Sequence, residues 1–271
     1  DMKITVLTDN KAKENLKGEW GLSLFIEHSG KKLLLDTGAS PLFAKNAEKC
    51  GVDLKAVDLA FLSHAHYDHS DGFGEFFRIN KNAPLYLSGC CKENCYGRRW
   101  IFSRYIGIKK GYAKTFSERL IYTDGFTEVT DGVYLLPHGE KDYSIYGKKN
   151  GLYQKDGRKW SYDCFDHEQS LVIKTDRGLV IFNSCCHTGA DNIINEVASA
   201  FPDEKILALI GGFHLYKSGD ADVISLAQRI KDTEIEKIYT GHCTGDRAFG
   251  LLKNELGDKA EELFAGKIIE L

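Results

Sequence analysis

Short apolar runs alternate with turn-forming residues through the first part of the chain, and this pattern predicts β-strands rather than long helices. The predicted strands cover residues 3–7, 21–27, 32–35 and 57–62. The third ends in Asp36-Thr37-Gly38, and a helix-like stretch follows Pro41. The fourth leads directly into a histidine-rich segment, residues 63–69. Because α/β folds usually place their sites at the carboxyl ends of strands, this segment is the first candidate for chemistry.

The second half of the chain repeats the apolar pattern of the first. Segments 23–37 and 59–66 resemble segments 170–184 and 207–214, with a glycine between the first two strands of each half. The repeat predicts two related halves that face each other. Under this interpretation Asp36, the first histidine segment, residues 185–187 and His214 lie at equivalent strand ends and meet in one cleft. The alternative is that strand and turn sequences resemble one another without a repeat.

Residues 90–165, between the halves, are rich in Tyr, Gly and Lys and have weak periodicity, which predicts an insertion over the site. From Lys92 to Arg119 there are eight basic and two acidic residues, a local excess of 8 − 2 = 6. Such a segment could bind an anionic, phosphorylated substrate, with Trp100 or Tyr105 stacking on a ring. The candidate substrate-binding residues are Arg98, Arg99, Trp100 and Arg104. A solvated basic face is the alternative.

Charge and cysteine content narrow the class of protein. Lys and Arg total 36 against 39 Asp and Glu, a net charge of −3, so we expect neither a nucleic-acid partner nor a membrane surface. Two of the cysteine pairs are adjacent in sequence, which favours neither a disulfide framework nor an iron–sulfur cluster. We therefore expect a cytoplasmic protein with a small anionic molecule as its partner. The oligomeric state is not indicated.

The histidine segment has the ligand types and spacing of a metal site. His64 and His66 can turn toward one metal ion, while Asp68 and His69 can turn toward a second point a few ångströms away. Hydrolytic two-metal centres hold their ions roughly 3.5 to 4 Å apart. Two divalent ions are expected, zinc first, although manganese or iron would accept the same ligands. The alternative is a set of histidines that are hydrogen-bonded in a core.

Further ligands must come from other strand ends. His187, His214 and His242 each follow an apolar strand, which favours a functional role for all three. Cysteines flank them, and a thiolate beside a metal could bind it. We expect Cys186 and Cys243 to be buried as small apolar side chains. Cys185 is left open between burial, metal binding and a bridging role.

The His-x-His-x-Asp-His pattern at residues 64–69, with Asp36-Thr37-Gly38 upstream, resembles the metallo-β-lactamase superfamily. The resemblance implies an α+β fold, a four-layer αββα sandwich formed by residues 1–271 as one domain, with the active site at one edge of the two sheets. The bridging Asp of the superfamily, expected after the strand that ends at residue 182, is replaced by Ser184-Cys185-Cys186-His187.

One branch of that superfamily, proteins like 7,8-dihydropterin-6-methyl-4-(β-D-ribofuranosyl)aminobenzene-5'-phosphate synthase, carries Cys-x-His-x-Gly, Gly-Gly-Phe-His-Leu and Gly-His-Cys-Thr-Gly. These motifs resemble residues 185–189, 211–215 and 241–245. The resemblance implies that the metal ligands are His64, His66, Asp68, His69, His187 and His242. His214 is implied as a ligand or a substrate contact.

These patterns favour a metal-dependent hydrolase with a binuclear site that acts on a small anionic substrate. Asp68 would orient the attacking hydroxide, and His214 or His242 would stabilise the developing anion. The first alternative is a transferase that joins a dihydropterin diphosphate to an aromatic amine ribofuranosyl phosphate and releases diphosphate. The second is a di-iron redox protein or a non-catalytic metal-binding protein.

Overall fold

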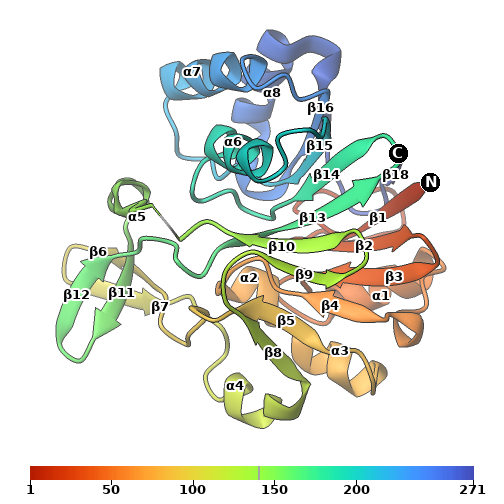
Figure 1. Cartoon of the computed structure of the whole chain (residues 1–271). Coiled ribbons are helices and arrows are strands. Elements are labelled where there is room, and N and C mark those ends of the chain that lie inside the picture. The colour runs from red at the N-terminus through yellow and green to blue at the C-terminus, as the bar shows by residue number, and fades with distance from the viewer. Residues whose placement is uncertain (140) are drawn as a thin grey trace.

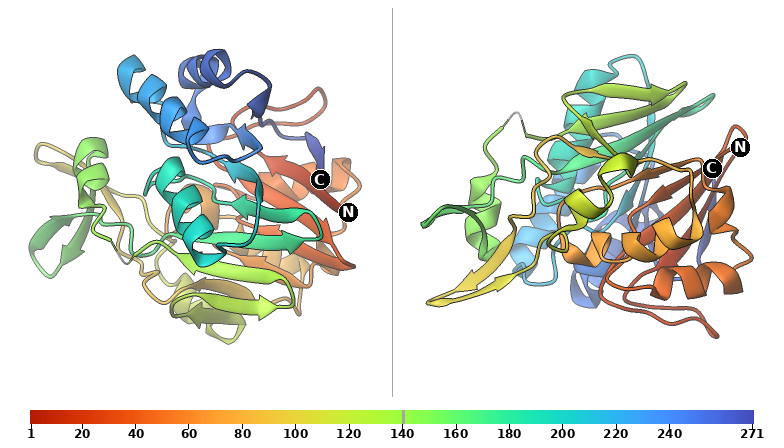
Figure 2. Two further views of the ribbon diagram at one scale, coloured as in Figure 1. Left: turned by 45° about the horizontal axis from the view of Figure 1, so that its top comes forward. Right: turned by 90° about the horizontal axis from the view of Figure 1, so that it is seen from below.

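The computed structural model describes residues 1–139 and 141–271 and has four layers (Figure 1). Two seven-stranded sheets pack face to face, and helices cover the outer face of each sheet (Figure 2). This arrangement confirms the α+β, αββα sandwich expected from the sequence. Each sheet is apolar on both of its faces, because its inner face packs against the other sheet and its outer face packs against helices.

The first sheet has the strand order β18-β1-β2-β3-β4-β5-β8. Its strands are β1 (Met2–Thr8), β2 (Ser23–His28), β3 (Lys31–Leu35), β4 (Leu59–Phe61), β5 (Leu85–Ser88), β8 (Leu120–Thr123) and β18 (Ile268–Glu270). The four strands predicted for this half correspond to β1 to β4, and the expected helix after Pro41 is α1. The helices on its outer side are α1 (Leu42–Lys49), α2 (Tyr67–Ser70), α3 (Phe73–Ile79) and α4 (Tyr112–Thr115).

The second sheet has the strand order β17-β16-β15-β14-β13-β10-β9. Its strands are β9 (Thr127–Thr130), β10 (Val133–Pro137), β13 (Gln169–Thr175), β14 (Gly178–Phe182), β15 (Ile206–Gly211), β16 (Lys237–Thr240) and β17 (Ala260–Glu262). The helices on its outer side are α6 (Ala190–Ala200), α7 (Asp220–Lys231) and α8 (Asp246–Leu256).

Three apolar clusters hold the layers together. The central one joins the sheets and includes Leu24 and Leu33 from the first and Val180 and Phe182 from the second. A second cluster packs α1 and α3 on the first sheet. A third packs α6, α7 and α8 on the second sheet. Burial of such side chains contributes roughly 1.5–3 kcal/mol each, so the sandwich is a stable frame for the loops at its edge.

The two halves have the same topology. Reading each sheet from its edge, β18-β1-β2-β3-β4-β5-β8 corresponds in order to β9-β10-β13-β14-β15-β16-β17. Counted from the edge strands β18 and β9, the first three strand pairings of each sheet are antiparallel and the last three are parallel. The carboxyl ends of β4 and β15, which carry His64 and His214, are therefore equivalent.

A separate four-stranded sheet projects from the sandwich on the side away from the chain termini (Figure 1). It consists of β6 (Tyr96–Arg99), β7 (Phe102–Tyr105), β11 (Leu152–Asp156) and β12 (Lys159–Tyr162), with α5 (Ser144–Asn150) beside it. We call these elements the arm. The insertion predicted over residues 90–165 includes too many residues, because β8, β9 and β10 within this range belong to the two main sheets. Residue 140 of that range lies outside the described residues.

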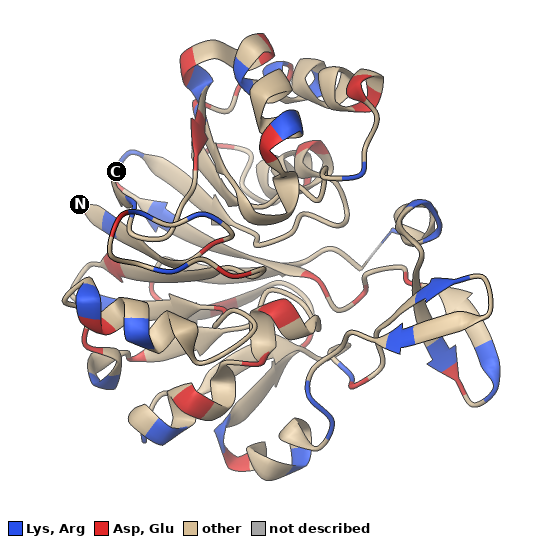
Figure 3. Cartoon of the chain, turned by 180° about the vertical axis from the view of Figure 1, so that it is seen from behind, with Lys and Arg blue, Asp and Glu red and all other residues tan. Residues whose placement is uncertain are grey.

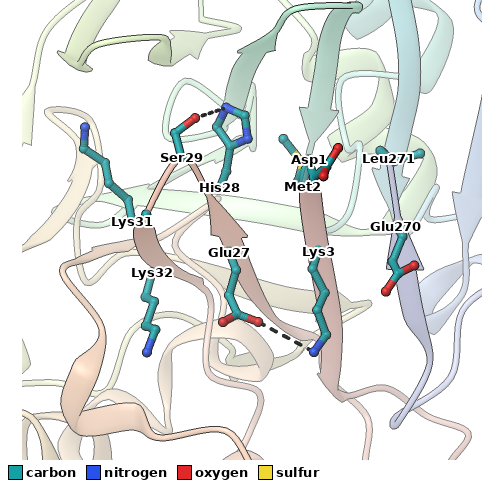
Figure 4. Close-up of a pocket in the computed structure, with 11 residues that line it drawn as sticks. Asp1, Met2, Lys3, Glu27, His28, Ser29, Lys31, Lys32, Glu270 and Leu271 are labelled. Carbon is teal, nitrogen blue, oxygen red and sulfur yellow. Dashed lines mark hydrogen bonds and ion pairs between the residues drawn. The ribbon is translucent and has the colours of Figure 1, made fainter.

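The other end of the strands carries a different cavity, of about 640 Å³, beside the chain termini (Figure 4). Its lining includes Lys3 and Glu27, which form an ion pair, and His28 and Ser29, which contact each other. All eight cysteines are free, as the sequence analysis expected. Among the described residues, no helix combines the length and the apolar character that a membrane span requires.

Candidate metal centre

The loop after β4 is fixed by the buried carboxylate of Asp36, which follows β3. Asp36 accepts hydrogen bonds from the Ser63 backbone N–H at 2.8 Å and from the Ser63 hydroxyl at 2.6 Å. It also accepts from Nδ1 of His69 at 2.9 Å. The adjacent ends of β3 and β4 bring these groups together, and the Asp36 contact leaves Nε2 of His69 directed elsewhere. Outer-shell partners of this kind orient histidines that bind metals.

Three imidazoles form a first group. The ring centre of His66 lies 4.6 Å from that of His64 and 4.8 Å from that of His187, and His64 and His187 are 4.9 Å apart. Nδ1 of His64 donates to the Ser63 hydroxyl at 2.8 Å. Its Nε2 therefore remains for another partner. The first two histidines come from the loop after β4, and the third comes from the equivalent loop after β14.

Asp68, His69 and His242 form a second group beside the first. Oδ2 of Asp68 lies 3.6 Å from Nε2 of His69 and 3.4 Å from Nε2 of His242. Nδ1 of His242 donates to Oδ1 of Asn10 at 2.9 Å, and the Asn10 amide donates to the His242 carbonyl at 3.1 Å. The ring is thereby held with Nε2 toward the carboxylate.

Cys185 lies between the two groups. Its Sγ is close enough to share a metal with His64 and His187, and also with His69 and His242. The Sγ is 3.2 Å from Nε2 of His69. Burial raises the pKa of the Cys185 thiol well above its usual range, so only a cation beside it would deprotonate it. From this position one sulfur atom could contact a metal ion held by either group.

Cys186 and Cys243 are both buried, as expected from the sequence. Cys186 points away from the centre and packs with the helices on the second sheet. Cys243 is not simply an apolar filler, because its Sγ is 3.4 Å from Sγ of Cys185 and accepts from the His214 backbone N–H at 3.2 Å. His214 lies beside the first group, with its ring centre 4.3 Å from that of His187.

The donor chemistry fits divalent metal ions. Five histidines at the centre have at least one buried ring nitrogen without a hydrogen-bond partner among the described residues: His64, His66, His187, His214 and His242. Burial lowers the pKa of His66 to about 3 and holds the pKa of His64 and His187 well below the usual range. Buried neutral imidazoles with unused lone pairs are costly unless something binds them, and metal ions bind neutral imidazole.

The sequence analysis missed residues that support the centre from outside. The buried carboxylate of Glu168 accepts from the backbone N–H groups of His187 and Thr188, at 2.7 and 2.9 Å. Nδ1 of His167 accepts from the Ala65 N–H at 3.1 Å, and its Nε2 donates to Asp163 at 3.2 Å. Their position directly before β13 was the available signal, because strand ends carry the other functional residues.

Asn10 provides a test of this support. We expect Asn10→Ala to weaken the binding of one metal equivalent about tenfold, because the His242 ring loses the contact that orients it. Metal affinity measured by competition with a chromogenic chelator checks this. Asn82→Ala, at an exposed position after α3, is the matched control and should leave affinity unchanged. Equal affinity in Asn10→Ala and wild type would contradict the role of Asn10.

A cavity of about 1090 Å³ lies between the centre and the arm. It reaches His66, Asp68, Cys185, His187 and His214. The structure brings all four predicted substrate-binding residues to the same cavity, namely Arg98, Arg99, Trp100 and Arg104. Its described lining includes six basic residues, which are Arg98, Arg99, Arg104, Lys148, Lys149 and Lys217, against one acid, Asp68. We call it the basic cavity; Figure 3 shows Lys and Arg on the arm and on α5.

The four-layer sandwich is the metallo-β-lactamase fold. The model of the metallo-β-lactamase superfamily matches residues 21–152. The chain is therefore similar to this superfamily over residues 21–152, as its motifs indicated.

Comparison with known proteins gives relatives that match over the full length. The chain is 29% identical over 285 residues to the 7,8-dihydropterin-6-methyl-4-(β-D-ribofuranosyl)-aminobenzene-5'-phosphate synthase of Methanocaldococcus jannaschii, across 100% of this chain and 97% of that protein. A solved structure described as a metal-dependent hydrolase of the β-lactamase superfamily matches with a TM-score of 0.86 and 29% identity, across 100% of this chain and 99% of that one. Zinc-bound PqqB from Methylobacterium extorquens shares the fold, with a TM-score of 0.59 and 12% identity across 99% and 100% of the two chains.

Proposed function

We propose that this protein is a metal-dependent hydrolase that acts on a small aromatic molecule bearing phosphate groups. The observation that carries the proposal is the basic cavity, which joins the histidine-rich centre to basic side chains and to aromatic side chains such as Trp20, Tyr67 and Tyr216. Cations select an anion, and rings stack on a ring. A closed, purely structural metal site would not open onto a cavity of this size.

Each group of residues at the centre has a different role in the proposed reaction. We infer one ion held by His64, His66 and His187, a second held by Asp68, His69 and His242, and Cys185 between them. Zinc, manganese or iron bound there would supply Lewis acidity and lower the pKa of a bound water. Asp68 is placed to orient the water that attacks. His214 lines the basic cavity, and its Nδ1 has no partner among the described residues, so it is placed to donate to the developing anion.

A transferase is the second candidate, favoured by the full-length similarity to a synthase. The basic cavity, at about 1090 Å³, is also larger than the roughly 300–1,000 Å³ that holds one ligand. In that reaction the nitrogen of an aromatic amine forms a bond to the methylene carbon of a dihydropterin diphosphate. The carbon–oxygen bond breaks, diphosphate leaves with the electron pair, and the amine proton passes to solvent.

One assay tests both. Metal-loaded protein is incubated with a panel of aryl phosphoesters and with a pterin diphosphate, with and without an aromatic amine, and phosphate and diphosphate release are measured. Release without amine supports the hydrolase, and release of diphosphate that requires the amine supports the transferase. No release from any compound by protein that retains its metal would overturn the proposal.

Arg104 tests the role of the basic cavity. Its guanidinium lies 5.7 Å from the ring centre of Tyr67, the residue that precedes Asp68 in the sequence. We expect Arg104→Ala to raise the Kd for inorganic diphosphate about tenfold, since a hydrogen bond to a charged group contributes roughly 1.5–3 kcal/mol and exposure to solvent reduces this. Calorimetric titration at fixed ionic strength checks it. Arg177→Ala, in the exposed turn between β13 and β14, is the control and should not change Kd.

A further inference from the structure

A smaller cavity, of about 240 Å³, also borders His187 and His214 and lies beside α6 and α7. α5, α6, α7 and the segment after β15 contribute its walls, and we call it the α6–α7 pocket. Four residues line both this pocket and the basic cavity, namely Lys149, Asn150, His187 and His214. The two spaces therefore meet at the candidate metal centre, where these residues form the partition.

The two spaces differ in charge. The basic residues of the α6–α7 pocket are already paired: Arg229 Nε lies 2.6 Å from Oδ2 of Asp191, and Lys149 Nζ lies 2.6 Å from Oδ2 of Asp222. Its apolar walls come from the buried side chains of Phe213, Leu215 and Leu226. A charged phosphate group would have to compete with these carboxylates. An uncharged group with polar atoms along one edge would match both the walls and the carboxylates.

His187, which lines this pocket, has ring nitrogens that the described residues leave without a partner. The residue is 4% exposed, and both of its ring nitrogens lack a partner among the described residues. A metal ion accounts for one nitrogen only, whereas a histidine that binds metal normally donates its other N–H to an acceptor. The start of α6 adds further unused donors, because the side chains of the described residues do not cap its first turn at Gly189.

We propose that the α6–α7 pocket is the subsite for the uncharged ring of the substrate, while the phosphate groups of the same molecule lie in the basic cavity. The proposal rests on the proposed function and specifies its substrate class: a flat heteroaromatic or amino-substituted ring with N–H donors on its edge. Asp191, which is 7% exposed, accepts from that edge, and the unused His187 nitrogen faces the ring. The candidate metal centre then lies between the ring and its phosphate groups.

The test separates the ring from the phosphate. Two phosphate-free rings, 6-hydroxymethylpterin and 4-aminobenzyl alcohol, are titrated by fluorescence, and inorganic diphosphate is titrated by calorimetry. Ser225→Trp places a large side chain at the mouth of the pocket from an exposed position on α7. Ala221→Trp, also exposed on α7 but away from the pocket lining, is the matched control. Thermal unfolding verifies that both variants fold.

We expect Ser225→Trp to weaken binding of one of the two rings at least tenfold and to leave diphosphate binding unchanged, with Ala221→Trp behaving as wild type. The ring that responds identifies whether a pterin or an aromatic amine occupies the pocket. Equal ring affinity in Ser225→Trp and wild type, or no binding of either ring, would overturn the subsite. If diphosphate fails to bind wild type while ring binding still responds to Ser225→Trp, the proposed function fails and the subsite stands.

Discussion

Replacing His66 with alanine will remove most of the bound metal and abolish activity. His66 is 5% exposed, its Nε2 lacks a partner among the described residues, and its ring borders both His64 and His187. Loss of an outer-shell partner costs about 10–100-fold in metal affinity or activity, and loss of a direct ligand should exceed that range. Elemental analysis should show metal falling from about two equivalents per chain to one or fewer.

His28→Ala is the matched control for this experiment. His28 ends β2 at the opposite end of the sheet, where its ring contacts Ser29 (Figure 4). The substitution should leave both metal content and activity at the wild-type level. Full metal content in His66→Ala would contradict the centre, and so would equal metal loss in both variants, because a general loss of folded protein would then be the cause.

The part of the centre that sequence predicts is the part that is local in sequence. The residues from His64 to His69 lie on one loop, and a short spacing pattern is enough to place them beside one another. The groups that orient them are distant: Asn10 and His242 are separated by 232 positions, and Ala65 and His167 by 102. Only the packing of the two sheets brings these pairs together, and no local pattern encodes it.

The repeat of the two halves explains why some distant residues of the candidate centre could still be predicted. His187 follows β14 and His214 follows β15, which correspond to β3 and β4 in the first half. Equivalent strand ends lie at the same edge of a face-to-face sandwich, so a repeated apolar pattern predicts convergence. The arm has no equivalent in the repeat. Its composition indicated a segment over the site, but the apolar runs of β8 and β10 were hidden within it.

The sequence did not decide the role of Cys185. For two adjacent cysteines, only the backbone conformation shows which side chain faces the candidate centre and which faces the core. Cys186 has a φ of 44° and packs among helix-side residues such as Ile193, whereas Cys185 faces His69 and His242. This contrast makes the neighbours a matched pair. A substitution of Cys185 removes a sulfur atom that faces the candidate centre, whereas the same substitution of Cys186 removes one that packs against the helices of the second sheet.

We expect Cys185→Ala to lose one metal equivalent and the thiolate-to-cobalt absorption of cobalt-substituted protein, because the shared ligand is gone. Cys186→Ala should keep both, at a stability cost of about 1 kcal/mol for the small cavity it leaves. Cys185→Asp should recover the second equivalent without the absorption band, since a carboxylate can bridge two ions but is not a thiolate. A band that persists in Cys185→Ala and vanishes in a Cys243→Ala variant would instead assign the metal-bound sulfur to Cys243, which lies 3.4 Å away.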